Sequence, residues 1–184
     1  TGSIAYSVAI GDLDGDGKAD LAVANYTSAT ISIFRNTGTN GILGTGSFAA
    51  KQDFTTGTAP YSIAIGDLDG DGKPDLAVAN LGSNTISVFR NTSSSGSISS
   101  SSFSANVDFA TGINPYSVAI GDIDGDGKPD LTTANLSSST LSVLRNTDVL
   151  TITTSGSLSA VNTTYGTASA NTSFSVSGTG LSAS

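Results

Sequence analysis

Short apolar stretches, in which hydrophobic side chains alternate with small or polar ones, recur along the chain. The first reads Tyr-Ser-Val-Ala-Ile at residues 6–10, and the next reads Leu-Ala-Val-Ala at residues 21–24. Alternation with β-branched side chains over about four to eight residues is typical of β-strands with one buried face. The pattern therefore predicts an all-β fold.

The apolar stretches fall into three groups, of which the first two match almost residue for residue. Four antiparallel strands make one blade of a β-propeller, and propellers usually have about four to eight blades. Three blades would form an incomplete propeller that is open at both ends. We expect strands at residues 6–10, 21–24, 30–35 and 48–54, at 61–65, 76–79, 85–90 and 103–109, and at 116–120, 131–134 and 140–145.

Several side chains recur at the same strand positions of all three groups. Three apolar positions should form the core between neighbouring sheets. A recurring tyrosine could offer a platform for sugars, but packing between blades is the favoured interpretation of an aromatic ring at a fixed strand position. A recurring arginine is predicted to anchor one blade to the next by hydrogen bonds. The positions are Val8, Ile63 and Val118; Ile10, Ile65 and Ile120; Leu21, Leu76 and Leu131; Tyr6, Tyr61 and Tyr116; and Arg35, Arg90 and Arg145.

An acidic loop with the pattern D-x-D-G-D-G-K-x-D separates the first and second strands of each group. Its three copies begin at Asp12, Asp67 and Asp122, with a constant period of 55 residues. A fixed period of this length indicates a repeat architecture.

The acidic loops are candidate metal sites, because clustered carboxylates repel one another and stay together only around a cation or in full contact with water. The glycines allow a tight turn, and a lysine carbonyl would add a backbone ligand. Hard oxygen donors in a flexible loop suit Ca²⁺ better than Mg²⁺, and the lack of Cys and His disfavours zinc. The predicted ligands of three Ca²⁺ ions are Asp12, Asp14, Asp16, Lys18 and Asp20; Asp67, Asp69, Asp71, Lys73 and Asp75; and Asp122, Asp124, Asp126, Lys128 and Asp130.

Two other interpretations of the loops are less favoured. A solvated acidic turn is the simpler one, because Asp and Gly are common in turns, but three full copies disfavour it. An EF-hand has the same opening but needs a Glu at the twelfth position, where Val23, Val78 and Thr133 stand here. Strands rather than helices also flank the loops, so the EF-hand is disfavoured.

The motif Y-S-V-A-I-G-D-L-D-G-D-G-K-x-D-L-A-V-A-N, followed by T-I-S-I-F-R-N-T, resembles the FG-GAP/VCBS repeats of bacterial surface and secreted proteins. Those repeats are relatives of the calcium-bearing blades in integrin α-chain propellers. The resemblance covers residues 1–147, as repeats at about 1–55, 56–110 and 111–147. It implies β-propeller blades with one Ca²⁺ each, and little about activity.

Residues 148–184 form a Ser/Thr/Gly-rich C-terminal segment, which lacks the F-x-x-x-x-D-F pattern of the two preceding fourth strands. Its stretches at 164–167 and 173–178 resemble the opening strands of a bacterial immunoglobulin-like domain. A complete domain of that kind needs about 100 residues, so this one would be partial. A linker, or a short β segment that donates a strand at 149–154 or 172–177 to another subunit, are the alternatives.

Composition restricts the setting and the partners. Of 15 acidic residues, all aspartates, only Asp53, Asp108 and Asp148 lie outside the loops, so three Ca²⁺ ions would neutralise most of the net charge of −8. Seven Lys and Arg form no basic patch for nucleic acid, and no apolar run is long enough to insert into a membrane. Without cysteine, calcium would replace disulfides, which favours an extracellular or cell-surface location. Because the sequence has no Met, we expect a processed chain or a section of a longer one.

An enzyme is not expected, because the chain has no His, Cys or Glu for acid–base or nucleophilic chemistry. The leading hypothesis is a calcium-stabilised structural or adhesive protein that self-associates as a homo-oligomer, or as a filament through strand exchange. A module that binds glycans and a spacer in a larger bacterial surface protein are the alternatives.

Overall fold

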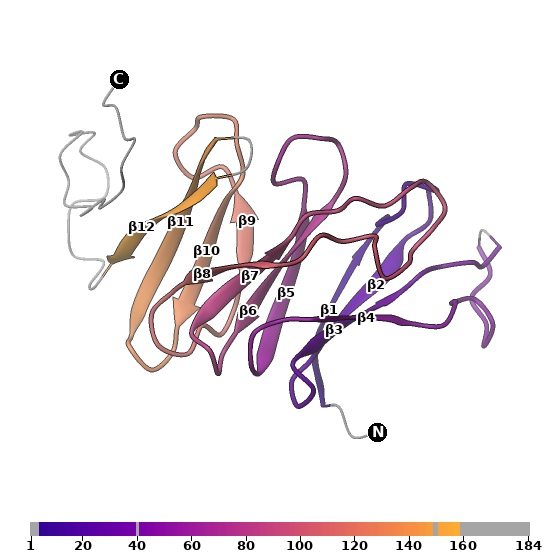
Figure 1. The fold of residues 1–184 in the computed structure, drawn as a ribbon, viewed down its shortest axis with the longest axis horizontal. Helices are drawn as coiled ribbons and strands as arrows, with labels where there is room; N and C mark the ends of the chain where they lie inside the picture. The colour runs from indigo at the N-terminus through magenta and orange to yellow at the C-terminus, as the bar shows by residue number, and fades with distance from the viewer. Residues whose placement is uncertain (1–3, 40, 149–150, 159–184) are drawn as a thin grey trace.

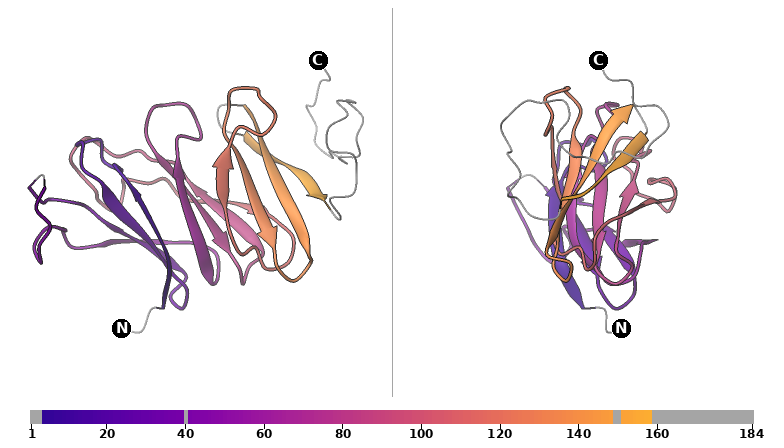
Figure 2. Two further views of the ribbon diagram at one scale, coloured as in Figure 1. Left: turned by 180° about the vertical axis from the view of Figure 1, so that it is seen from behind. Right: turned by 90° about the vertical axis from the view of Figure 1, so that its left-hand side faces the viewer.

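The computed structural model describes residues 4–39, 41–148 and 151–158 of the chain. Over these residues it contains twelve strands in three antiparallel sheets and no helix. The sheets follow one another along the long axis of the molecule (Figure 1), and in the end-on view of Figure 2 they overlap. The predicted all-β fold of three four-stranded, propeller-type blades that do not close into a ring is therefore confirmed.

Each blade is a meander in which strands adjacent in sequence are paired neighbours. The predicted strands are present, and their ends shift by a few residues because the isolated bridges at Phe48, Phe103 and Pro115 are not part of continuous ladders. The first blade consists of β1 (Ala5–Gly11), β2 (Asp20–Asn25), β3 (Thr30–Phe34) and β4 (Gln52–Thr55). The second consists of β5 (Pro60–Gly66), β6 (Asp75–Asn80), β7 (Thr85–Phe89) and β8 (Val107–Ala110). The third consists of β9 (Ala119–Gly121), β10 (Asp130–Asn135), β11 (Thr140–Asp148) and β12 (Thr151–Leu158).

The fourth strand of the third blade comes from the C-terminal segment. β12 pairs with β11 of the same chain, with Leu141 opposite Leu158 and Arg145 opposite Thr153. It follows β11 without the long connection that precedes β4 and β8. Most of the candidate donor strand at 149–154 is thus already paired within its own chain, whereas the second candidate and the immunoglobulin-like stretches lie outside the described residues.

The core lies between the blades. One cluster joins the first blade to the second, and an equivalent cluster joins the second to the third. Among the expected core positions, Ile63 and Val118 are 7% and 8% exposed, but Val8 at the same position of the first blade is 58% exposed. The expectation that the recurring apolar positions are buried in every blade is therefore wrong for Val8 and Ile10, because no described blade precedes the first.

The recurring tyrosines pack against one another from blade to blade. The ring centroids of Tyr6 and Tyr61 are 4.5 Å apart, and those of Tyr61 and Tyr116 are 4.2 Å apart. Tyr6 and Tyr116 remain 48% and 44% exposed. The hydroxyl of Tyr61 donates a hydrogen bond to that of Tyr116, and this bond raises the pKa of Tyr61 to about 12. The interpretation as inter-blade packing is confirmed, with the row of rings lying at the surface.

Polar side chains connect the strands within a blade. The amide of Asn25 in β2 donates to the hydroxyl of Ser32 in β3 at 2.8 Å, and that hydroxyl donates to Asp53 in β4 at 2.6 Å. Asn80, Ser87 and Asp108 repeat the arrangement in the second blade. Buried polar groups need hydrogen-bond partners, and Asp53 and Asp108 accept the hydrogen bonds of the buried hydroxyls of Ser32 and Ser87. This role accounts for two of the aspartates outside the acidic loops.

A buried asparagine links the second and the third blade to the acidic loop of the blade before it. The Asn91 side chain is fully buried, and its Nδ2 donates to the carbonyls of Leu13 in the first loop and Pro74 in its own blade, both at 2.8 Å. Asn146 makes the equivalent bond to Leu68 at 2.7 Å. This asparagine, next to the recurring arginine, is therefore a hydrogen-bonding anchor between blades.

We predict that Gly57→Ala destabilises the joint between the first two blades. A Cβ at Gly57 would lie 2.6 Å from Nδ2 of Asn80, a fully buried side chain that is fixed by its bonds to Thr85 and Ser87. Overpacking of this kind costs about 1–3 kcal/mol of unfolding free energy. Denaturant titration measures it. Gly44→Ala is the control, because a Cβ there meets nothing within 4 Å; an equal loss in both variants would contradict the prediction.

We also predict that Asn91→Ala lowers the unfolding free energy by about 1–3 kcal/mol, because it leaves buried polar groups without their partners. Asn36→Ala is the matched control. Asn36 keeps the bonds within its own blade, to the Ala19 carbonyl and from the Gly38 amide, but has no described preceding loop to contact. Denaturant titration of dilute protein should give the smaller loss for the control. Equal losses would show that the bond to Leu13 adds nothing to stability.

Candidate metal centres

The acidic loops connect β1 to β2, β5 to β6 and β9 to β10, and each follows the same backbone path. In the first loop Gly15 and Gly17 have φ values of 67° and 85°, and the glycines of the other two loops have similar positive values. Side chains other than glycine adopt this left-handed region at a cost. A Cβ at Gly15 or Gly17 would meet nothing within 4 Å, so lack of space is not the reason for glycine at these positions. The positive φ angles of the turn are the reason, and they explain the D-G-D-G spacing.

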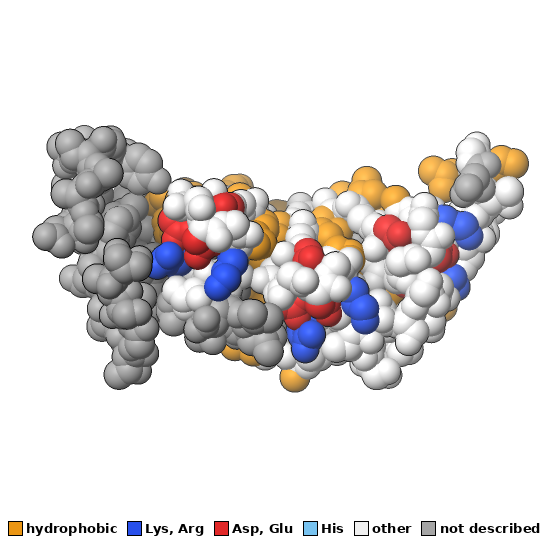
Figure 3. All heavy atoms as spheres, turned by 90° about the horizontal axis from the view of Figure 1, so that it is seen from above, with side chains coloured by type: hydrophobic (Ala, Val, Ile, Leu, Met, Phe, Trp, Pro, Cys, Tyr) orange, Lys and Arg blue, Asp and Glu red, His pale blue; other side chains and the backbone are white. Residues whose placement is uncertain are grey.

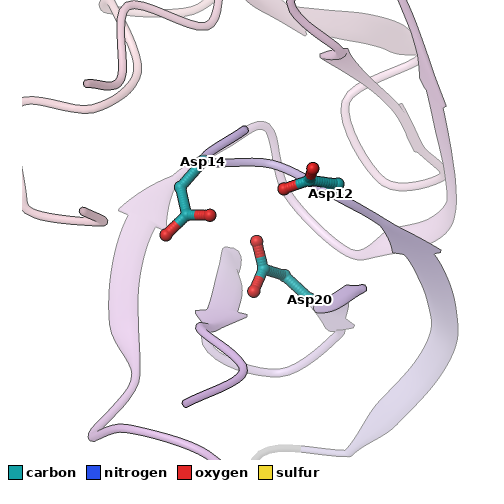
Figure 4. Close-up of side chains that lie close together, drawn as sticks. All are labelled: Asp12, Asp14 and Asp20. Carbon is teal, nitrogen blue, oxygen red and sulfur yellow. The ribbon is translucent and has the colours of Figure 1, made fainter. Parts of the chain in front are cut away.

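Three carboxylates converge in each loop. Figure 4 shows Asp12, Asp14 and Asp20 of the first loop, whose side chains point toward a common centre. One oxygen from each member of a trio lies within 4.8 Å of the others. The trios are Asp12, Asp14 and Asp20; Asp67, Asp69 and Asp71; and Asp122, Asp124 and Asp130.

Backbone amides hold two of these carboxylates in the first loop. The carboxylate of Asp12 accepts hydrogen bonds from the amides of Asp16 at 3.1 Å and Gly17 at 2.8 Å. The carboxylate of Asp20 accepts from the amides of Leu13 at 3.0 Å and Asn36 at 2.7 Å. The loop is therefore folded around its own first and ninth residues.

The last aspartate of each loop is buried beneath it. Asp20, Asp75 and Asp130 are at most 1% exposed. Burial, and to a lesser extent neighbouring carboxylates, raise the pKa of Asp20 and of Asp75, while the hydrogen bonds from backbone amides act in the opposite direction; the net result for Asp75 is a pKa of about 6. A nearby cation would favour the charged form of these groups.

The recurring arginines face the acidic loop of their own blade. Nε of Arg35 donates to Asp14 at 2.5 Å, and its Nη2 lies 3.2 Å from Asp16. Arg90 and Arg145 pair in the same way with the loops of the second and third blades. The prediction that they anchor one blade to the next is wrong. The pairing of β3 with β2 sets Phe34 opposite Leu21, which brings the arginine to the base of the loop.

Figure 3 shows the acidic side chains in separate groups along one side of the molecule, each with basic side chains beside it. The ammonium groups of Lys73 and Lys128 donate to backbone carbonyls of Ser93 and Thr147, both at 3.0 Å. The ammonium group of Lys18 instead lies 3.8 Å from the carboxylate of Asp16 in its own loop. The predicted ligand in each loop is the backbone carbonyl of the lysine. That ligand stays a prediction.

The donor set fits a hard divalent cation. Each trio consists of carboxylate oxygens alone, the choice that Ca²⁺ prefers, on a loop whose backbone is already turned around them. The predicted ligands Asp16 and Asp126 lie outside their trios and face arginines, and in the second loop Asp71 takes the place expected for Asp75. The full ligand set therefore remains a prediction, and the three trios are the part that the structure brings together.

The role of Asn91 and Asn146 as hydrogen-bonding anchors between blades was not predicted, although the recurring Arg-Asn pair is visible in the sequence. Nor was it predicted that the second residue of each of the first two loops belongs to the core. Leu13 and Leu68 are 1% and 6% exposed and pack between blades. The acidic loop is thus part of the joint between blades and not an appendage of it.

The described residues contain no helix that is long and apolar enough to cross a membrane. No curated protein matches the sequence. A crystal structure of BBS1N in complex with ARL6DN, soaked with lead, is similar with 18% identity and a TM-score of 0.39. The similarity covers 83% of this chain and 57% of that one, so the chain spans little more than half of its length.

The FG-GAP-like repeat family matches residues 12–78 and 67–133, which together make up more than half of the chain. Each match runs from the first aspartate of one acidic loop through the loop of the next blade. Each match therefore includes two acidic loops and the strands between them. This chain belongs to the FG-GAP-like repeat family.

Proposed function

We propose that this chain is an extracellular structural or adhesive module that is stabilised by three Ca²⁺ ions and associates with copies of itself. The observation that carries the proposal is the convergence of three carboxylates in each of three equivalent loops, two of which lie at joints between blades. FG-GAP-like repeats of the propeller type support a structural or adhesive module rather than an enzyme.

The position of the loops supports a stabilising role for the ions. The carbonyl of Leu13 in the first loop accepts hydrogen bonds from Asn91 at 2.8 Å and from Ser93 at 2.9 Å, both in the second blade. The carbonyl of Asp14 accepts from the amide of Gly96 at 2.9 Å. An ion that fixes the loop backbone would also fix these acceptors, so Ca²⁺ bound in the loop would hold neighbouring blades together.

An extracellular location follows from the same reasoning. The chain has no cysteine and cannot form disulfides, and calcium sites can supply equivalent cross-links where the ion is abundant. A bacterial surface protein, in which this chain could also act as a spacer, would provide that setting.

The tyrosine row bears on the alternative of glycan binding. Sugars stack on the open faces of aromatic rings, but the rings of Tyr6, Tyr61 and Tyr116 lie against one another at centroid distances of 4.5 and 4.2 Å. Most of their faces are therefore used within the row. This favours the structural role over a lectin-like one.

We predict that Ca²⁺ raises the melting temperature and that a chelator lowers it. A site present only in the folded state adds about 2.7 kcal/mol of stability when free ligand is 100 times its Kd, and 1 kcal/mol shifts the melting temperature of a chain of this size by roughly 2–4 °C. Calorimetric titration should give three ions per chain. An unchanged melting temperature in excess chelator would contradict a structural role of the ion.

The double variant Asp122→Asn, Asp124→Asn should bind two ions per chain, because it removes two carboxylates of the third trio. Asp53→Asn is the control. It also removes a negative charge, but Asp53 lies in β4 and bonds to Ser32 and Lys51 away from the loops. It should still bind three ions, and a loss of binding in this control would show that overall charge and not the trio is responsible.

A further inference from the structure

The two ends of the row of blades expose apolar surfaces that are buried at the same positions inside the row. We call the exposed side of β1 the leading face, with Tyr6, Val8 and Ile10 exposed at 48%, 58% and 67%. We call the opposite side of the third blade the trailing face, where Ile123 is 41% exposed and Ala134 is also exposed.

Within the chain, each leading position is covered by the blade before it. Ile63 and Val118 occupy the position of Val8 and are 7% and 8% exposed. Gly11 of the first blade lies so close to Ile65 that a Cβ there would be 3.2 Å from its side chain. The two internal joints, between the first and second blades and between the second and third, therefore show which surface packs against a leading face.

Each trailing position is likewise covered by the blade after it. Leu13 and Leu68 occupy the position of Ile123 and are 1% and 6% exposed. Ala24 and Ala79 occupy that of Ala134, and both are fully buried. The trailing face of the third blade is thus the surface that covers a leading face elsewhere in the chain.

The polar groups at the two ends are complementary as well. At the internal joints the amides of Ile63 and Val118 donate to the hydroxyls of Ser7 and Ser62 at 3.3 and 3.2 Å. By the repeat, the matching donor on the leading face is the amide of Val8, and the matching acceptor on the trailing side is the exposed hydroxyl of Ser117.

The hydrogen bond that the buried asparagine makes at each internal joint also has an equivalent donor and an equivalent acceptor at the two ends of the row. Asn91 and Asn146 donate to the carbonyls of Leu13 and Leu68. At the leading end the side chain of Asn36 has, among the described residues, hydrogen bonds within its own blade alone, to the Ala19 carbonyl and from the Gly38 amide. The equivalent acceptor at the trailing end is the carbonyl of Ile123.

We propose that the leading face of one copy of this chain docks on the trailing face of a second copy and reproduces the internal blade-to-blade joint. The inference rests on the proposed self-association and names its surface. Strand exchange is not needed, because each described sheet already has four strands. Since the two faces differ, the contact is heterologous, and its repetition builds a filament unless the rotation between copies closes a ring. The tyrosine row would continue across the contact from Tyr116 to Tyr6 of the next copy.

The test compares Val8→Asp and Ile123→Asp with the wild-type full chain by sedimentation velocity in Ca²⁺. Each substitution would bury an unpaired carboxylate in the joint and should weaken association at least about 100-fold. Both side chains are exposed in the single chain, so folding should be kept, which the melting temperature verifies. Val107→Asp is the matched control, since Val107 is 56% exposed on β8 of the middle blade, and it should associate like the wild type.

Mixing the two face variants gives a sharper result. Val8→Asp retains only its trailing face and Ile123→Asp only its leading face, so each alone should be a monomer and the equimolar mixture should form a dimer and nothing larger. Asn36→Ala should weaken wild-type association about tenfold through the loss of one hydrogen bond.

The outcomes separate the two proposals. A wild-type chain that stays monomeric in Ca²⁺ would overturn self-association and the docking of the two faces together. If the wild type associates and Val8→Asp and Ile123→Asp associate equally well, the docking of the leading face on the trailing face would be overturned, but self-association would not. Strand exchange would then be the favoured mechanism of self-association.

Discussion

Repulsion between carboxylates at the joints of the row is the constraint on which the rest of the structure depends. Twelve of the 15 aspartates lie in three short loops, and the first two of these loops also insert an apolar side chain, Leu13 or Leu68, into the core between blades. Charge and core therefore cannot be separated in space. The chain must neutralise or bond the carboxylates at the place where it buries most apolar surface.

The protein itself supplies two of the means to do so. Backbone amides donate to the first and last aspartates of the first loop, and Arg35, directly after β3, pairs with the two aspartates between them. One arginine for four carboxylates leaves each loop with net negative charge. A divalent cation on the three converging oxygens would remove most of that excess.

Features that follow from local pattern were predictable from the sequence. The strands of the first two blades and the acidic loops were expected from two-residue alternation and the D-G-D-G spacing, because side-chain direction and positive φ are properties of a few adjacent residues. The partners of Arg35 and the exposure of Val8 were not. Strand pairing decides which loop the arginine reaches, and the exposure of Val8 depends on whether a blade precedes it, which no property of its own strand encodes. β12 was also missed as a fourth strand, because its sequence shares no motif with β4 or β8.

The three loops are equivalent in sequence but unequally enclosed, and this connects cation binding to the joint. The side chain of Asp14 is fully buried, that of Asp69 is 7% exposed, and that of Asp124 is 31% exposed. Exposure increases toward the trailing end, where no described blade covers the third loop. Water weakens the attraction between a carboxylate and a cation, so an enclosed loop holds an ion more tightly than an open one. A blade that covered the third loop would therefore strengthen ion binding there. Because coupling between two binding events is reciprocal, the ion would strengthen the contact with that blade by the same factor.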